Sequence, residues 1–318
     1  MLTKSVTKLA STPIAVLVSA AEAASGRLGW KTLERATRAL HRDGLVVLQN
    51  AIPDHGPLEH LNQKMIADAK ELQARGEDSP YNYNKGNIQQ DPPLMSKYFS
   101  PSIFFNPLAT QVTSSVMGPR PRLTFVSGNT AMPPETDADR GLAQPTHSDA
   151  DFLHPNCPFA LVVNVPLVDM SIENGSTEVW LGTHHSDISI QEGAHGERAS
   201  GRIIQPALDA RRQIRPPSQP LVPKGSIVIR DLRLWHGGMP NNGTDPRVML
   251  AMIHFAPWFR NAMTVEFADD LRGAVDKVAT ELTVQADFIP EEVYCERYLN
   301  RPFGNAYKFD QEELIEFI

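Results

Sequence analysis

Two short segments carry side chains that together suit a metal ion. The first is Gln144-Pro-Thr-His147-Ser-Asp149, and the second places His236 directly before two glycines. In an extended chain residues i and i+2 project to the same side, so His147 and Asp149 are able to share one ion. Two imidazoles and one carboxylate occupy one face of an octahedral ion and leave three positions open, as in non-haem Fe(II) oxygenases. A hydrolytic zinc centre is the alternative, although structural zinc sites are usually closed by four protein ligands.

A candidate anion-binding residue follows the second segment. Arg247 lies eleven residues after His236 and begins a predicted strand over 247–257. A planar guanidinium binds a carboxylate through two parallel hydrogen bonds. We therefore expect Arg247 to bind the distal carboxylate of 2-oxoglutarate, whose other end chelates the ion. The alternative for this arginine is a surface ion pair, which contributes little to stability.

Three motifs, in this order and at these separations, resemble the phytanoyl-CoA dioxygenase family. They are residues 144–149, the segment Glu173-Asn-Gly-Ser-Thr-Glu-Val-Trp-Leu-Gly-Thr-His184, and His236-Gly-Gly followed by Gly243-Thr-Asp-Pro-Arg247. The resemblance spans about residues 45–258 and is strongest between 144 and 255. More narrowly, the chain looks like fungal-type members associated with secondary metabolism. The resemblance implies a double-stranded β-helix core and an enzyme that uses Fe(II), 2-oxoglutarate and O₂, with ascorbate in a supporting role.

The resemblance also implies roles for the residues of the first and third motifs. His147, Asp149 and His236 match the iron ligands of the family, and Arg247 matches the arginine that forms a salt bridge with 2-oxoglutarate. Family members that halogenate their substrates replace the carboxylate ligand with a small residue. Because Asp149 is present, the sequence argues against halogenation.

Other polar residues of these motifs have alternative roles. Gln144 matches a glutamine that hydrogen-bonds the cosubstrate in relatives, but it also suits a turn before a proline. The hydroxyl of Thr177 is a second candidate for contact with 2-oxoglutarate, with a cross-strand hydroxyl pair as the alternative. His184 and His185 are expected to support the structure, because the set of ligands is complete without them. Asp151 also lies on the face of Asp149, but the His-X-Asp spacing favours Asp149.

Substrate contacts are expected from two loops near the proposed metal site. Residues 77–94 are polar and show no periodicity, and long loops of this kind are often functional. We expect Tyr81, Tyr83 and Asn87 in this loop, and Phe152 after the first motif, to contact the substrate. The tyrosines have an alternative role in packing beneath the loop.

Residues 191–219 have the composition of a long insertion that lies over the mouth of the site. Its arginines suit an anionic substrate such as a CoA ester, or else form ion pairs in a solvated loop; they are Arg198, Arg202, Arg211 and Arg212.

The family resemblance implies the type of reaction. Decarboxylation of 2-oxoglutarate to succinate and CO₂ drives hydroxylation, desaturation or oxidative rearrangement of a small organic metabolite, with natural-product biosynthesis as the expected setting. One alternative is an acyl-CoA 2-hydroxylase. Another is a catalytically inactive metal-binding jelly roll that acts as a scaffold or sensor.

The segments that must position these residues are mainly strands. Short extended runs separated by Gly, Pro and Asn cover 123–126, 159–167, 176–181, 225–230 and 247–257, with no helical pattern between them. This pattern is typical of an antiparallel sandwich, jelly roll or barrel. Amphipathic patterns predict helices over 30–42 and from Pro57 to Gly76, and a clear one over 291–298. We therefore predict a single domain over 1–318, with a β core at about 122–258 and flanking helices.

Composition excludes several functional classes. The 318 residues include 30 Lys and Arg against 37 Asp and Glu, a net charge of −7, which argues against a dedicated nucleic-acid binder. No apolar run is long enough to span a membrane. Two cysteines are too few for a disulfide framework, so a reducing cytoplasmic setting is expected, ahead of a peroxisomal or secreted one. The segment after Phe267 is a candidate homodimer contact.

Overall fold

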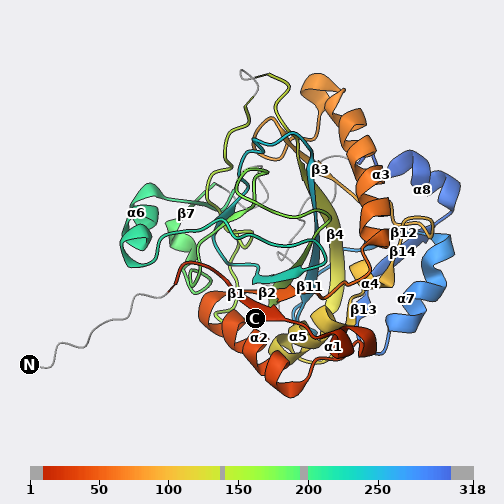
Figure 1. Cartoon of the computed structure of the whole chain (residues 1–318), viewed down its shortest axis with the longest axis horizontal. Helices are drawn as coiled ribbons and strands as arrows, with labels where there is room; N and C mark the ends of the chain where they lie inside the picture. Colours follow the sequence, from red (N-terminus) through yellow and green to blue (C-terminus); the bar gives the residue numbers. More distant parts are fainter. Residues whose placement is uncertain (1–9, 137–139, 194–199, 302–318) are drawn as a thin grey trace, which may run out of the picture.

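The computed structural model describes residues 10–136, 140–193 and 200–301 (Figure 1). Its largest element is an eight-stranded sheet in the order β1-β2-β9-β5-β11-β4-β13, with β3 also paired to β4. The pairings from β2 to β4 are antiparallel, whereas β1 with β2 and β13 with β4 are parallel. The strands are β1 (Ile14–Leu17), β2 (Leu45–Gln49), β3 (Asn87–Gln90), β4 (Arg122–Ala131), β5 (Ala160–Pro166), β9 (Ile227–Asp231), β11 (Arg247–Phe255) and β13 (Thr283–Val284).

A smaller layer faces this sheet. It contains β6 (Glu178–Val179) paired with β10 (His236–Gly237), together with single bridges such as that between His147 and His236. Apolar side chains from both layers form one cluster between them, namely Leu45, Val47 and Val228 from the large sheet and Met170, Val179, Val222 and Leu234 from the opposite side. The predicted jelly-roll core with flanking helices is therefore confirmed, although the large sheet is mixed and not purely antiparallel.

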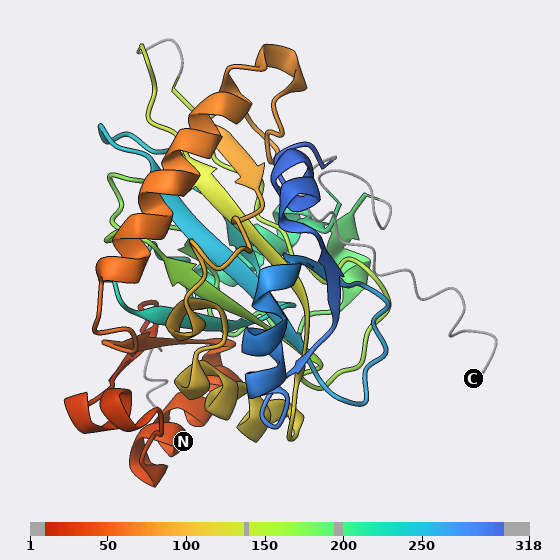
Figure 2. The ribbon, with the colours of Figure 1, turned by 90° about the vertical axis from the view of Figure 1, so that its right-hand side faces the viewer.

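Helices cover the outer face of the large sheet, as Figure 2 shows. The strands are buried on both faces: in β2, Val46 and Leu48 pack on the helical side, while Leu45 and Val47 point between the layers. The covering helices are α2 (Trp30–Asp43), α3 (Gly56–Gln73) and α5 (Pro107–Met117). The predicted helices over 30–42 and from Pro57 are thus confirmed. Gly44 ends α2 because its backbone is left-handed, with φ at +75°.

Short elements account for most differences from the predicted pattern. Residues 77–94 contain β3 as well as loop, and residues 191–219 contain β7 (Gln191–Glu192), β8 (Arg202–Ile203) and α6 (Gln205–Ile214). The helix predicted over 291–298 is confirmed as α8 (Glu291–Arg297). The remaining elements are α1 (Ala20–Ser25), α4 (Pro101–Phe104), α7 (Arg272–Val278), β12 (Val265–Ala268), β14 (Ala286–Ile289), and the 3₁₀ helices η1 (Gly76–Asp78), η3 (Ile188–Ile190) and η4 (Asp269–Leu271).

None of the helices in the described ranges is both long and apolar enough to cross a bilayer.

Candidate metal and cosubstrate site

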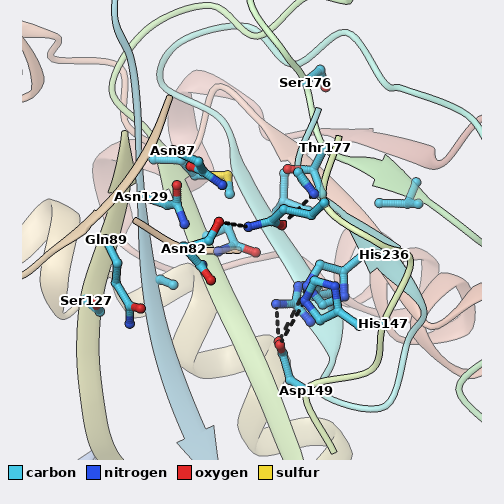
Figure 3. A pocket seen from close by; sticks show the side chains of 18 of the residues that line it. Asn82, Asn87, Gln89, Ser127, Asn129, His147, Asp149, Ser176, Thr177 and His236 are labelled. Atoms are coloured by element: carbon cyan, nitrogen blue, oxygen red, sulfur yellow. Dashed lines mark hydrogen bonds and ion pairs between the residues drawn. The ribbon is translucent and has the colours of Figure 1, made fainter. Parts of the chain in front are cut away.

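Backbone pairing brings the two histidines of the first and third motifs together. His147 and His236 form an antiparallel bridge in which each backbone N–H donates to the carbonyl of the other at 2.9 Å. Their ring centroids lie 4.3 Å apart. Asp149 points to the same place, with its carboxylate oxygens 3.7 Å from His147 Nε2 and 3.7 Å from His236 Nε2 (Figure 3). Residues far apart in the sequence therefore present three ligand atoms to one point.

Hydrogen bonds hold both imidazoles with Nε2 directed at this point. His147 Nδ1 lies 2.8 Å from the Pro145 carbonyl, and His236 Nδ1 lies 3.0 Å from the Leu234 carbonyl. Since a carbonyl only accepts, each Nδ1 carries the proton and each Nε2 keeps a free lone pair. Burial lowers the pKa of His147 and lowers that of His236 further, so both rings are neutral near pH 7. Neutral imidazole is the form that binds metals.

A neighbouring arginine keeps the carboxylate of this group charged. Arg230, on β9, donates from Nη2 to Asp149 Oδ2 at 2.5 Å, and both side chains are buried. Burial alone would raise the pKa of Asp149, but the charge and the hydrogen bond of Arg230 outweigh it and hold this pKa well below its ordinary value. The second guanidinium nitrogen of Arg230, Nη1, is buried and has no hydrogen-bond partner among the described residues.

The three side chains meet the requirements of a small divalent ion. Nitrogen and carboxylate ligands bind such ions at about 2.0–2.2 Å, so ligand atoms of one ion lie within about 4.4 Å of each other. The two separations of 3.7 Å satisfy this limit. In the described part of the chain, His147, Asp149 and His236 are the one group of three or more His, Cys, Asp or Glu side chains close enough for an ion. Two imidazoles and one carboxylate leave room for further ligands, which fits an iron centre.

Arg247 lies in the same cavity and is ready for an anion. It begins β11, is 2% exposed, and donates from Nη2 to the Gly175 carbonyl at 2.8 Å. Its Nε is buried without a partner among the described residues, and burial lowers the pKa of Arg247 to about 10. Gly175 itself is required, since its φ is +80° and a Cβ would lie 2.5 Å from the Met239 carbonyl oxygen. Arg247 is therefore a buried cation and not part of a surface ion pair.

Gln144 and Thr177 both line this cavity, but their surroundings differ. The Gln144 side chain connects two segments: Oε1 accepts from the Gly238 backbone N–H at 2.7 Å, and Nε2 donates to the Asn82 carbonyl at 3.3 Å. Thr177 lies on the segment that leads to β6, near the triad in Figure 3. A contact of either side chain with a cosubstrate stays a prediction.

The predicted substrate residues divide into two groups. Tyr83 and Asn87 line the cavity, and the Tyr83 ring lies 4.8 Å from the ring of His147. Tyr81 does not line it; its ring packs with Ile88 and other apolar residues beneath the loop, which is the packing role left open above. Phe152 does not line the cavity either: it is 7% exposed and packs against Phe159 in the main core. Of the four residues the structure brings Tyr83 and Asn87 to the cavity, and contact of any of the four with a substrate stays a prediction.

The other histidines and the second aspartate of the family motifs do not join the candidate metal ligands. His184 is buried, packs on His185 and is outside the cavity lining. Asp151 lines the cavity and accepts a hydrogen bond from Ser200, but it is not part of the ligand group.

The arginines of residues 191–219 do not line the cavity where the structure describes them. Arg211 donates to the Leu181 carbonyl, and Arg212 pairs with Asp209 and lies 5.1 Å above the Trp180 ring. Arg198 lies outside the described residues. Arg202, on β8, is exposed and forms a backbone bridge with His147. The structure therefore gives Arg211 and Arg212 packing and surface roles on and around α6.

Sequence reasoning missed Arg230, Gln89 of β3 and the polar residues of β4. Arg230 follows the apolar run Ile227-Val-Ile, and a charge within such a buried strand is a usable signal of an inward-facing functional group. Gln89, Ser127 and Asn129 line the cavity opposite the triad (Figure 3). Their signal is weak: they are polar residues at i and i+2, but each strand also carries polar residues on its other face.

The chain is similar to solved structures and matches one family model. The chain is similar to the epimerase SnoN in its complex with Fe³⁺, alpha ketoglutarate and nogalamycin RO, at 18% identity and a TM-score of 0.51, covering 71% of this chain and 84% of that one. It is also similar to a second SnoN structure, at 18% identity and a TM-score of 0.49, covering 71% of this chain and 83% of that one. The carbocyclase SnoK from nogalamycin biosynthesis is similar at 14% identity and a TM-score of 0.48, covering 70% of this chain and 83% of that one. A model of the family described as phytanoyl-CoA dioxygenase (PhyH) matches residues 40–249, about two thirds of the chain. The chain therefore belongs to the phytanoyl-CoA dioxygenase family, a family of Fe(II)- and 2-oxoglutarate-dependent oxidoreductases.

Proposed function

We propose that the protein is a dioxygenase that oxidises a small organic metabolite while 2-oxoglutarate is converted to succinate and CO₂. The observation that carries the proposal is the convergence of His147, Asp149 and His236 in one cavity of about 320 Å³ with the buried guanidinium of Arg247, which makes no ion pair with a described residue. A ligand group with open positions and a nearby carboxylate receptor are the two parts that 2-oxoglutarate chemistry requires.

Each residue of the site has a defined task in this proposal. His147, Asp149 and His236 hold Fe(II), and Arg247 receives the distal carboxylate of 2-oxoglutarate. When bound, the iron and its cosubstrate supply the activation of O₂ and the oxidation of an unactivated C–H bond. Arg230 keeps the Asp149 carboxylate ionised and oriented, and Gln144 holds the loop of the first motif against Gly238.

The cavity favours a compact substrate. Its volume is near the lower end of the roughly 300–1,000 Å³ typical of small-molecule sites, and it must receive both the cosubstrate and the reacting part of the substrate. The SnoN fold holds Fe³⁺, alpha ketoglutarate and nogalamycin RO together, so this architecture accommodates all three components. We infer a tailoring role in natural-product metabolism in the cytoplasm, where the exposed thiols of Cys157 and Cys295 stay reduced.

Metal and cosubstrate titrations test the proposal. Anaerobic addition of Fe(II) and 2-oxoglutarate to the wild-type protein should produce their visible charge-transfer band, and the band should be absent in His147→Ala. Admission of O₂ should release succinate. Binding of iron without succinate release across a broad set of substrates would indicate a scaffold or sensor. Activity that survives strict anaerobiosis, or that zinc supports, would refute the oxygenase and indicate a hydrolase.

A further inference from the structure

The wall opposite the metal ligands is built from neutral polar side chains. Asn87 and Gln89 alternate along β3, and Ser127 and Asn129 alternate along β4. The two strands pair antiparallel, with Gln89 opposite Asn129, so all four side chains lie on one face, where they line the cavity. Figure 3 shows this amide wall across from His147, Asp149 and His236. We use "amide wall" for these four residues.

Two of the carboxamides lack the partners that a structural role requires. The Oδ1 atoms of Asn87 and Asn129 are buried and have no hydrogen-bond partner among the described residues. Buried polar groups in folded proteins are nearly always hydrogen-bonded, and exceptions need an explanation. Both side chains line the cavity, so a bound molecule with hydroxyl or N–H groups would supply the missing partners once the carboxamides turn toward it.

The charges of the cavity argue against an anionic substrate. Among the described lining residues the charged ones are Asp149, Asp151, Arg230 and Arg247. Arg230 is paired with Asp149, and in the proposed function Arg247 binds 2-oxoglutarate. No lining cation of the described chain then remains for a carboxylate or phosphate of the substrate. A fatty acyl chain fits no better, because it would leave the carboxamides of the amide wall without partners.

We propose that the amide wall binds the non-reacting part of the substrate, and that the substrate is an uncharged molecule bearing hydroxyl or amide groups. The inference rests on the proposed function for the role of Arg247, and it excludes the acyl-CoA alternative. Carboxamides both donate and accept hydrogen bonds, so they recognise hydroxyl and amide groups in a fixed orientation. That orientation would direct one carbon of the substrate toward the metal ligands.

Measurements of ligand binding to the whole protein test this inference without requiring catalytic turnover. The probes are uncharged polycyclic alcohols and lactams, each with its O-methyl or N-methyl derivative and its carboxylic acid counterpart, together with palmitoyl-CoA. Affinities are measured by calorimetry for the wild type, for Asn87→Leu/Asn129→Leu, and for Asn62→Leu. Asn62 is a matched control, because its Oδ1 is also buried without a partner but it lies on α3, outside the cavity.

In the wild type, the alcohols and lactams should bind at least tenfold more tightly than their methylated and acidic counterparts. The double variant should lose this preference, Asn62→Leu should keep it, and 2-oxoglutarate affinity should be equal in all three proteins. The inference is overturned if acids or palmitoyl-CoA bind as tightly as the alcohols, if the double variant keeps the preference, or if no uncharged probe binds. Failure of the wild type to bind 2-oxoglutarate would instead refute the proposed function.

Discussion

Replacement of Arg247 by methionine tests two properties of this residue separately. One is its effect on the stability of the fold, and the other is its contribution to 2-oxoglutarate binding. Nη2 is occupied by the Gly175 carbonyl at 2.8 Å, while Nε is buried without a partner among the described residues. A carboxylate that reaches this guanidinium gains charge-assisted hydrogen bonds worth about 1.5–3 kcal/mol each. Loss of one member of such a buried pair costs about 2–5 kcal/mol. We expect Arg247→Met to lose about 3–4 kcal/mol, or roughly 200- to 1,000-fold, in 2-oxoglutarate affinity.

The same substitution should not destabilise the free protein. Arg247 makes no ion pair with another described residue, and a buried cation without a counter-charge is costly. The thermal midpoint of the apoprotein should therefore be unchanged or higher in Arg247→Met, while the increase caused by 2-oxoglutarate should disappear.

Calorimetric titration with 2-oxoglutarate and thermal scans with and without it measure both effects. Arg247→Lys is the control: it keeps the charge but loses the planar donors, so its affinity should lie between those of the wild type and Arg247→Met. A 2-oxoglutarate affinity within fivefold of the wild type, or loss of iron binding in Arg247→Met, would refute the assignment.

Three further predictions concern buried arginine–aspartate pairs. Arg230→Met should weaken Fe(II) binding about 10- to 100-fold in anaerobic titrations, because it removes the partner that orients the Asp149 carboxylate; unchanged affinity would contradict this role. Arg215→Met should lower the free energy of unfolding in urea by about 3 kcal/mol, since it leaves the fully buried Asp43 with Arg42 alone; a loss below about 1 kcal/mol would contradict the pairing. The hydrogen bonds and charges of Arg42 and Arg215 outweigh burial and lower the pKa of Asp43, so the stabilisation is complete above its unfolded pKa and is lost as pH falls through the folded one. Asp43→Asn should therefore flatten the acid limb of a stability–pH curve, and an unchanged limb would exclude this carboxylate as a cause.

The convergence of the three candidate metal ligands was predictable because their signal is local. His147 and Asp149 are two residues apart in an extended segment, and the glycines after His236 mark a close backbone approach. Arg247 was predictable by its separation from His236 within the family motif. The apolar strands were predictable for the same reason, since extended apolar runs and the turn residues between them are properties of short segments.

The two tyrosines of the 77–94 loop illustrate where local patterns fail. Tyr81 and Tyr83 are two residues apart and are equivalent in an alternating strand, yet only Tyr83 lines the cavity. Tyr83 has a left-handed backbone, with φ at +67°, and this breaks the alternation. Phe152 failed for a related reason: its loop turns the ring into the main core beside Phe159.

Local sequence therefore indicated the candidate metal ligands, whereas the sheet decided what surrounds them. The partner of Asp149 is Arg230 on β9, and the opposite wall comes from β3 and β4, whose amides face the site only because Gln89 and Asn129 are in register. Such contacts join residues tens of positions apart. Their geometry depends on strand order, register and backbone twist, which follow from packing of the whole core and not from the residues adjacent in sequence.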